Sequence, residues 1–258
     1  MIHRIGLYDS GVGGLSVARE VRKALPRADM IYVADTCHVP YGGRPFSDIK
    51  AFSAGIGAFL ISQDIDLLII ACNVSSAVAC GDLRSRYPGV PVISMIENGA
   101  GAALSGRSVG VLATEGTVKS GAYPAALRAM GFGGDIVQEA CPEFVPLVEG
   151  RLLDTPECRE ACERHCSRVR HMDTVILGCT HYPLMGDLLR DCLPGCRMAD
   201  PAVSVAKALA CEESRGTGSL TCYTTGDIKS FEQTASLFVS GISAKSAVWR
   251  DGRLEKDD

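Results

Sequence analysis

Short apolar runs alternate with amphipathic segments along most of this chain. The runs have the length and composition of buried β-strands and cover residues 5–8, 30–34, 67–71, 90–93, 109–112, 174–177 and 220–224. Between them, apolar residues recur at helical spacing, as at Leu15, Ala18, Val21 and Leu25, and again over residues 51–61 and 202–210. This alternation predicts βαβ units, and therefore an α/β fold in which helices cover both faces of parallel sheets.

The residues that directly follow these runs are small, polar or nucleophilic. In parallel α/β sheets, ligands bind beyond the carboxyl ends of the strands. The residues found there include Asp9, Ser10, Tyr41, Gly42, Cys72, Asn73, Thr114, Cys179, Thr180 and His181. We therefore expect a functional site at this edge of the sheet.

Two pairs of segments resemble each other at nearly the same separation. Residues 5–11 resemble 109–115, and residues 68–73 resemble 175–180. Two similar α/β units facing each other would place Cys72 and Cys179 on opposite sides of one cleft, although chance similarity between ordinary strand–turn–helix units remains an alternative. The expected domains are residues 1–95 together with 205–258, and residues 96–204.

Cys72 and Cys179 are candidate acid–base groups. The ordinary pKa of a thiol is about 8.5, and a helix N-terminus lowers it, so we expect both cysteines, each opening a predicted helix, to ionise readily. Asp9 and His181 are their candidate proton relays. Two bases on opposite faces of a carbon acid would invert its configuration, because one removes a proton and the other delivers one from behind. One cysteine with one histidine would instead suit a hydrolase, and the residues alone do not separate these two functions.

Composition and charge restrict the binding partners and the cellular location that we expect. The chain has 258 residues, 47% hydrophobic and 22% charged, with a net charge of −4. It has no basic surplus to neutralise phosphates, which argues against nucleic acid as a partner. Its longest apolar run is too short to span a membrane, and its first residues lack a secretory pattern. With 12 cysteines in a chain of this size, we expect a cytoplasmic protein with reduced thiols.

The sequence predicts neither an organic cofactor nor a metal. Ser16 stands where a dinucleotide-binding turn would have its third glycine, and no lysine follows a strand to anchor pyridoxal phosphate. Cys158, Cys162 and Cys166 recur every four residues with His165 beside them, which raises the alternative of a zinc or iron–sulfur site. Their spacing fits no standard metal motif well, so we expect a packed helix face that uses cysteine as a small apolar residue.

An ordered set of motifs identifies a family. The motifs occupy residues 8–15, 32–35, 38–42, 71–73, 113–123, 141–149, 178–184 and 200–202. With them the chain resembles the bacterial glutamate racemases, within the aspartate/glutamate racemase superfamily. The resemblance implies two α/β domains related by pseudo-twofold symmetry, catalysis without a cofactor, and a supply of D-glutamate for peptidoglycan.

The resemblance also implies roles for residues. Cys72 and Cys179 match the two catalytic thiols. Asp9 and His181 match their assisting groups, and Glu149 matches a carboxylate that orients the histidine. The positions that hold the substrate are Ser10, Tyr41, Gly42, Asn73, Val74, Thr114, Thr117 and Thr180.

Two residues depart from the family pattern. Val74 stands where the family usually has threonine, which removes a hydroxyl that Ser75 can replace. Asn98 stands where it usually has proline, in a loop expected near the crossover between domains. Because of Val74, aspartate or another related acidic amino acid is an alternative to glutamate as the substrate. The assembly is left open, with a homodimer as one candidate.

Overall fold

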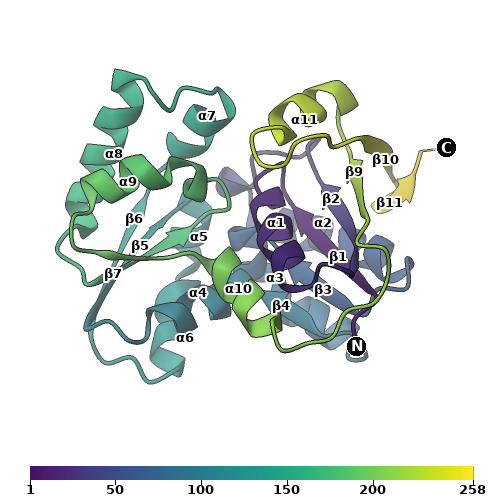
Figure 1. Ribbon diagram of the computed structural model, residues 1–258, viewed down its shortest axis with the longest axis horizontal. Helices are drawn as coiled ribbons and strands as arrows, with labels where there is room; N and C mark the ends of the chain where they lie inside the picture. The colour runs from purple at the N-terminus through teal and green to yellow at the C-terminus, as the bar shows by residue number, and fades with distance from the viewer. Residues whose placement is uncertain (258) are drawn as a thin grey trace.

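Strands β1 to β11 form two sheets in the computed structural model, which describes residues 1–257 (Figure 1). The first sheet contains β1 (Arg4–Asp9), β2 (Asp29–Ala34), β3 (Leu67–Ile70), β4 (Val92–Ser94), β9 (Leu220–Thr224), β10 (Ala244–Arg250) and β11 (Arg253–Lys256). The second contains β5 (Ser108–Ala113), β6 (Asp135–Ala140), β7 (Thr174–Gly178) and β8 (Arg197–Ala199). The pairings are parallel, apart from the antiparallel pair of β10 and β11 at the edge of the first sheet.

The two sheets repeat one strand order. The first runs β11-β10-β9-β2-β1-β3-β4, and the second runs β6-β5-β7-β8. The order β2-β1-β3-β4 therefore matches that of the second sheet, with β1 in the place of β5 and β3 in the place of β7. These strands contain the segments that resemble each other in sequence, so the predicted pair of similar parallel α/β units is confirmed.

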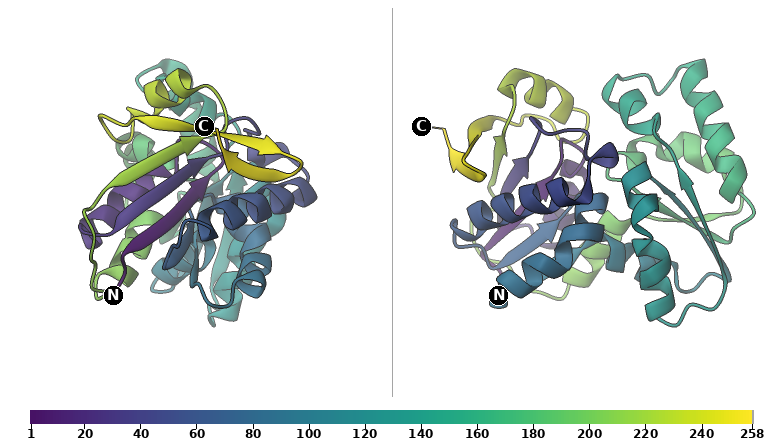
Figure 2. Two further views of the ribbon diagram at one scale, coloured as in Figure 1. Left: turned by 90° about the vertical axis from the view of Figure 1, so that its right-hand side faces the viewer. Right: turned by 180° about the vertical axis from the view of Figure 1, so that it is seen from behind.

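Helices cover both faces of each sheet (Figure 2). They are α1 (Leu15–Ala24), α2 (Phe46–Ile61), α3 (Asn73–Arg86), α4 (Met95–Ala103), α5 (Glu115–Ser120), α6 (Ala122–Ala129), α7 (Phe144–Glu149), α8 (Pro156–Val169), α9 (Gly186–Cys192), α10 (Pro201–Leu209) and α11 (Ile228–Ala235), with 3-10 turns η1 (Tyr41–Gly43) and η2 (Tyr182–Met185). Side-chain caps fix several starts: Ser94 accepts from the N–H of Ile96, and Asp200 accepts from the N–H of Ala202.

Successive residues of the central strands face opposite helical layers. Leu7 of β1 belongs to the same apolar core as Leu15 of α1, whereas its neighbour Tyr8 belongs to the core that contains Phe59 of α2. This follows from the two-residue period of a strand. Both faces are buried, which explains why these strands are continuous apolar runs in the sequence.

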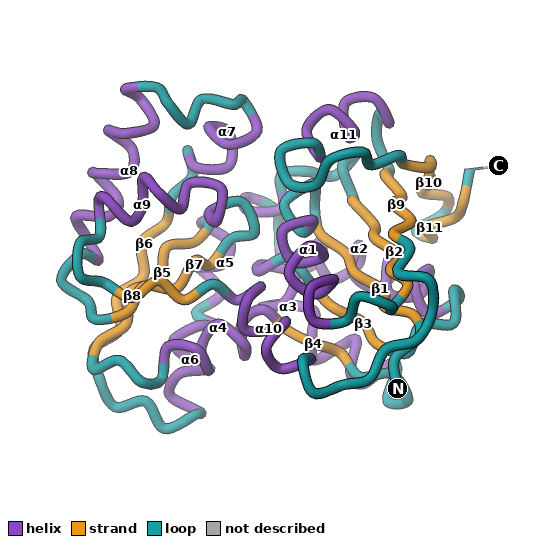
Figure 3. Tube along the Cα trace, viewed as in Figure 1, coloured by secondary structure: helices purple, strands orange, loops and turns teal. Residues whose placement is uncertain are grey.

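The chain passes from one sheet to the other through α4 and returns through α10 (Figure 3). Helix α10 contacts both α1 and α4, so the two crossings lie side by side. Asn98 lies inside α4 and not in the predicted loop, because its side-chain N–H donates to the backbone oxygen of Ser94 at 2.9 Å within a capped helix. We propose residues 1–95 with 205–258, and residues 96–204, as the two domains, with α10 spanning the second boundary.

Four strands are absent from the sequence prediction: β6, β8, β10 and β11. They are either very short or partly exposed, so they do not form apolar runs. Among residues 1–257, no helix has the length and apolar character needed to cross a membrane.

Candidate active site

A cavity of about 560 Å³ opens at the carboxyl ends of β1, β3, β5 and β7, between the two sheets. It is lined by 12 of the site residues predicted from sequence: Asp9, Ser10, Tyr41, Gly42, Cys72, Asn73, Val74, Thr114, Glu149, Cys179, Thr180 and His181. The remaining one, Thr117, is fully buried behind the wall, where its hydroxyl lies 3.1 Å from that of Thr114. Both units contribute side chains, so the cavity needs both sheets.

Cys72 lies two residues after the end of β3 and directly precedes α3. Only 5% of it is exposed. Burial, together with the charge of Asp9, raises the pKa of its thiol to about 12. The predicted lowering of this pKa by the helix N-terminus is therefore wrong, because desolvation of the thiolate outweighs the helix dipole.

Cys179 follows β7 and is 8% exposed. The prediction that it opens a helix is also wrong: Thr180 and His181 come next, then the 3-10 turn η2, and α9 begins only at Gly186. The local turn folds His181 back, so that its Nδ1 atom lies 3.8 Å from the Cys179 sulfur. A histidine, and not a helix terminus, is the polar neighbour of this thiol.

His181 is held between Cys179 and Glu149, the last residue of α7. Its Nε2 atom lies 2.8 Å from Oε1 of Glu149. Burial alone would lower the pKa of His181, but the hydrogen bonds to Cys179 and Glu149 and the charges of those two groups raise it to about 10. The imidazole is therefore protonated at neutral pH.

Asp9 is the acidic group on the Cys72 side of the cavity. It is 1% exposed, and its Oδ2 atom accepts a hydrogen bond from the N–H of Gly14 at 2.9 Å. Burial raises the pKa of its carboxyl, although the charge of His181 and the N–H groups of the glycine turn lower it. One thiol thus has a carboxylate nearby and the other an imidazolium.

Close packing holds the two sides of the cavity in register. The Oγ atom of Ser16 in α1 donates to the backbone oxygen of Thr180 at 3.0 Å. A Cβ atom on Gly13 would overlap Oγ1 of Thr180 and Nδ1 of His181, and one on Gly116 would lie 2.7 Å from the backbone oxygen of Gly42. Gly13 lets its backbone approach two side chains of the second unit, and Gly116 lets the backbones of the two units touch.

The cavity can bind an anion without a basic side chain. None of the residues that line it, all of them within the described chain, is lysine or arginine. The 14-residue helix α3 begins at the wall of the cavity, and the backbone N–H groups of Asn73 and Val74 lie in its first turn. Such N–H groups attract carboxylates. The Tyr123 hydroxyl donates to Oδ1 of Asn73 at 2.7 Å and fixes its amide.

Sequence reasoning missed the apolar part of the wall. Pro142, Val145 and Pro146 line the cavity, and Val145 and Pro146 lie in α7 one turn before Glu149. They belong to the motif at residues 141–149, of which only Glu149 was predicted to be a site residue. Ser75, which was expected to replace the missing hydroxyl at residue 74, is fully buried and is not part of the lining.

The cysteine-rich segment is α8. Cys158, Cys162 and Cys166 lie on its buried face within the main apolar core. His165 does not join them: its two ring nitrogens lie 2.8 Å from Glu139 and 2.9 Å from Glu143. Within residues 1–257, these cysteines form no group of three ligands close enough to share a metal ion. This arrangement supports a packing role for the three thiols.

Comparison with known proteins gives a consistent picture. The chain matches the family model for Asp/Glu/Hydantoin racemase over residues 15–209. A glutamate racemase of Desulforudis audaxviator is 43% identical over 211 residues, which cover 79% of this chain and 77% of that protein. The crystal structure of a glutamate racemase from Bacillus anthracis has a TM-score of 0.89 and 30% identity, and covers 97% of this chain and 98% of that one. The structure from Francisella tularensis in complex with D-glutamate has a TM-score of 0.85 and 26% identity, with 95% of each chain covered.

Proposed function

The chain belongs to the Asp/Glu/Hydantoin racemase family and is thus an amino-acid racemase, and we propose that it interconverts L- and D-glutamate with Cys72 and Cys179 as its two acid–base groups. The observation that carries this proposal is the placement of the two thiols after equivalent strands, β3 and β7, on one cavity between the two units. A hydrolase would have no use for the second thiol.

The proposed reaction needs one thiolate and one thiol. In this proposal Cys179, which faces the protonated His181, acts as the thiolate, and Cys72, whose pKa is raised by burial, acts as the thiol. Cys179 takes the α-proton from one face of the substrate, and the Cys72 thiol delivers its proton to the opposite face. The product is the other enantiomer, with a thiol on Cys179 and a thiolate on Cys72. The reverse reaction starts from that state.

Two carboxylates assist the proton transfers in this proposal. Glu149 keeps His181 protonated and oriented through its contact with Nε2, while Nδ1 faces Cys179. Asp9, with a raised pKa, relays a proton from solvent to the Cys72 thiolate between turnovers, while Cys179 releases the proton it gained to solvent. Each thiol then has a partner that suits the charge it must carry.

The substrate is proposed to be glutamate because of the lining and the relatives. The N–H groups at the start of α3, with Ser10, Tyr41, Gly42, Thr114 and Thr180, suit an amino acid that carries two carboxylates. The related structure from Francisella tularensis contains D-glutamate. Thr117 would act through Thr114. We further propose that the D-glutamate supplies peptidoglycan synthesis.

A chiral assay tests this proposal. Purified protein is incubated with each enantiomer of glutamate and of aspartate, without pyridoxal phosphate, and the optical composition is followed. Glutamate should approach a racemic mixture from both sides, and aspartate should react much more slowly. Racemisation of aspartate without that of glutamate would overturn the substrate assignment. Rescue of a D-glutamate-requiring bacterial strain by the gene, but not by a Cys72→Ala variant, would support the cell-wall role.

A further inference from the structure

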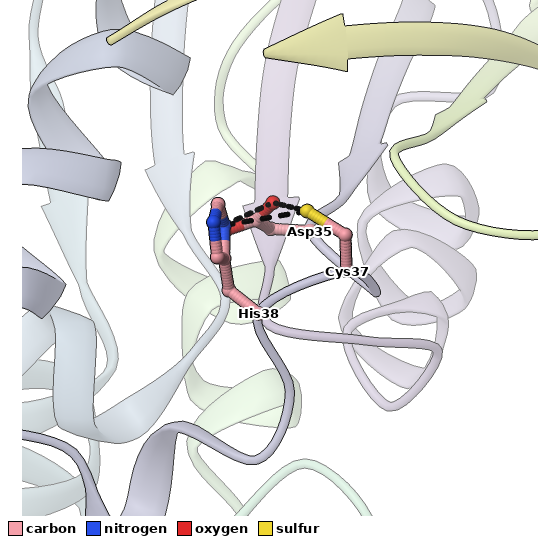
Figure 4. A group of neighbouring side chains, drawn as sticks. All are labelled: Asp35, Cys37 and His38. Atoms are coloured by element: carbon pink, nitrogen blue, oxygen red, sulfur yellow. Dashed lines mark hydrogen bonds and ion pairs between the residues drawn. The ribbon is translucent and has the colours of Figure 1, made fainter.

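Asp35, Cys37 and His38 form a cluster on the turn after β2 (Figure 4). The residues that follow them, from Val39 to Gly43, line the cavity. Asp35 is fully buried, His38 is partly exposed and Cys37 is exposed. None of the three lines the cavity. The proposed racemisation uses none of them, so their convergence requires a separate explanation.

The distances within the cluster are close to those between the ligand atoms of a zinc ion. The Cys37 sulfur lies 3.4 Å from Nδ1 of His38 and 3.6 Å from Oδ1 of Asp35, and Nδ1 of His38 lies 2.9 Å from Oδ2 of Asp35. Tetrahedral zinc, with bonds of about 2.0–2.3 Å, holds its ligand atoms roughly 3.3–3.6 Å apart. The two sulfur distances already fit this range, and the carboxylate and imidazole need to separate only slightly.

The carboxylate is held from its other side. Oδ1 of Asp35 accepts from Nε1 of Trp249 at 2.8 Å and from the Thr225 hydroxyl at 2.9 Å, and Oδ2 accepts from the Tyr41 hydroxyl. The His38 ring stacks on Phe52, with centroids 3.9 Å apart and an interplanar angle of 9°. Outer partners of this kind fix the orientation of ligands in metal sites.

We propose that Asp35, Cys37 and His38 bind one zinc ion, or another divalent transition metal with the same ligand preference, with solvent as the fourth ligand. A thiolate, an imidazole nitrogen and a carboxylate oxygen are a donor set that suits zinc. The exposed Cys37 provides the path of entry. On binding, the metal replaces the thiol proton of Cys37 and the proton between His38 and Asp35, while the bonds from Trp249 and Thr225 remain.

Zinc titration of the purified full-length protein tests this proposal. Isothermal titration calorimetry should give one equivalent of bound Zn²⁺ for wild type and for Cys211→Ser, which removes another exposed thiol. Cys37→Ser and His38→Gln should each weaken binding at least tenfold, with racemisation by Cys37→Ser in the presence of a chelator unchanged. Unchanged zinc affinity of Cys37→Ser would overturn the proposal.

The two cavity thiols could also attract zinc, so the assignment needs a second arm. A Cys72→Ala/Cys179→Ala variant should still bind one equivalent, and its Co²⁺ form should show thiolate-to-cobalt charge-transfer absorption. Adding Cys37→Ser should remove that absorption. If zinc binding disappears when the two cavity thiols are replaced, the metal belongs to the cavity and the proposed site is wrong. This result does not depend on whether the substrate is glutamate.

Discussion

Nε2 of His181 lies 2.8 Å from Oε1 of Glu149, so the carboxylate at the end of α7 helps to keep the imidazole next to Cys179 protonated. This carboxylate is one of the groups that raise the pKa of His181 to about 10. A group whose pKa is raised in the folded state keeps its proton until the pH approaches that pKa. His181 should therefore lose its proton only in strongly alkaline solution.

Replacing Glu149 with glutamine should therefore move the alkaline limb of the pH profile to lower pH. The amide keeps a hydrogen-bonding group but removes the negative charge, so His181 loses its proton nearer the ordinary value. We expect kcat/KM at pH 8 to fall roughly tenfold, because each unit of pKa corresponds to about 1.4 kcal/mol. Glu143→Gln, whose carboxylate contacts His165, is the matched control and should leave the profile unchanged. A Glu149→Gln profile identical to wild type would contradict the proposed role.

Replacing either cavity cysteine with alanine should abolish racemisation in both directions. Each direction needs one thiol as base and the other as acid, so the losses should be similar, about 10²–10⁴-fold or more. Circular dichroism should show unchanged folding. Cys222→Ala, which removes a buried thiol of β9 outside the cavity, should keep activity. Near wild-type racemisation by Cys179→Ala would remove the two-thiol mechanism and favour a single-cysteine function for Cys72.

Isotope labelling in heavy water separates two bases from one. Early in the reaction, solvent deuterium should enter the product enantiomer only, because the delivering thiol carries a solvent-derived proton. The recovered starting enantiomer should stay unlabelled, since the abstracting thiol returns its proton before exchange. Mass spectrometry after chiral separation measures both pools. Label in both enantiomers, or internal return of the original proton, would indicate a single base.

Val74→Thr should keep or improve binding of glutamate. Val74 lies in the first turn of α3, lines the cavity and is 3% exposed, and threonine has nearly the same shape. One added hydrogen bond to the substrate is worth about 0.5–1.5 kcal/mol, which corresponds to a fall in KM of up to roughly tenfold. Val78→Thr, one helical turn later and outside the lining, should leave KM unchanged. A large rise in KM for Val74→Thr would contradict the predicted hydrogen bond to the substrate.

Gly13→Ala should disable the site, because its new Cβ would overlap Thr180 and His181. Displacement of His181 by about 1 Å is expected to cost roughly 10²-fold in kcat/KM. Gly11→Ala is the control from the same turn: a Cβ there meets nothing closer than 3.9 Å, so activity should be retained. Thermal unfolding of both variants distinguishes lost positioning from lost stability. Equal activity of the two variants would contradict the proposed close approach.

The sequence predicted the central strands and the edge strand β4, but it missed β6, β8, β10 and β11. β1, β3, β5 and β7 are buried on both faces, which requires continuous apolar runs. β6 is partly exposed along its length and reads as a mixture of polar and apolar residues, while β8 has three residues. Edge strands of this kind are defined by their neighbours, which lie far away in the chain.

The site residues could be predicted from their positions directly after strands, but the pKa values of the site could not be predicted from the sequence. Residues after strands converge because parallel strands end at one edge, so Cys72 and Cys179 could be found without a structure. The pKa of Cys72 could not, because the desolvation that raises it depends on burial between the two units. The contact of Glu149 with His181 joins the end of a helix to the turn after a strand. The two residues are 32 positions apart, so no local sequence pattern predicts that they meet.

The strand order of the first sheet also determines which of the two units can finish folding first while the chain is being synthesised. β2 pairs with β9, which is made only after all four strands of the second sheet. The second unit can therefore fold while one edge of β2 still waits for its partner, as domains fold during synthesis. A nascent chain stopped before residue 220 exposes that unpaired edge, the kind of surface through which chains associate edge to edge. Aggregation during expression should thus depend on the last strands, which carry none of the catalytic groups.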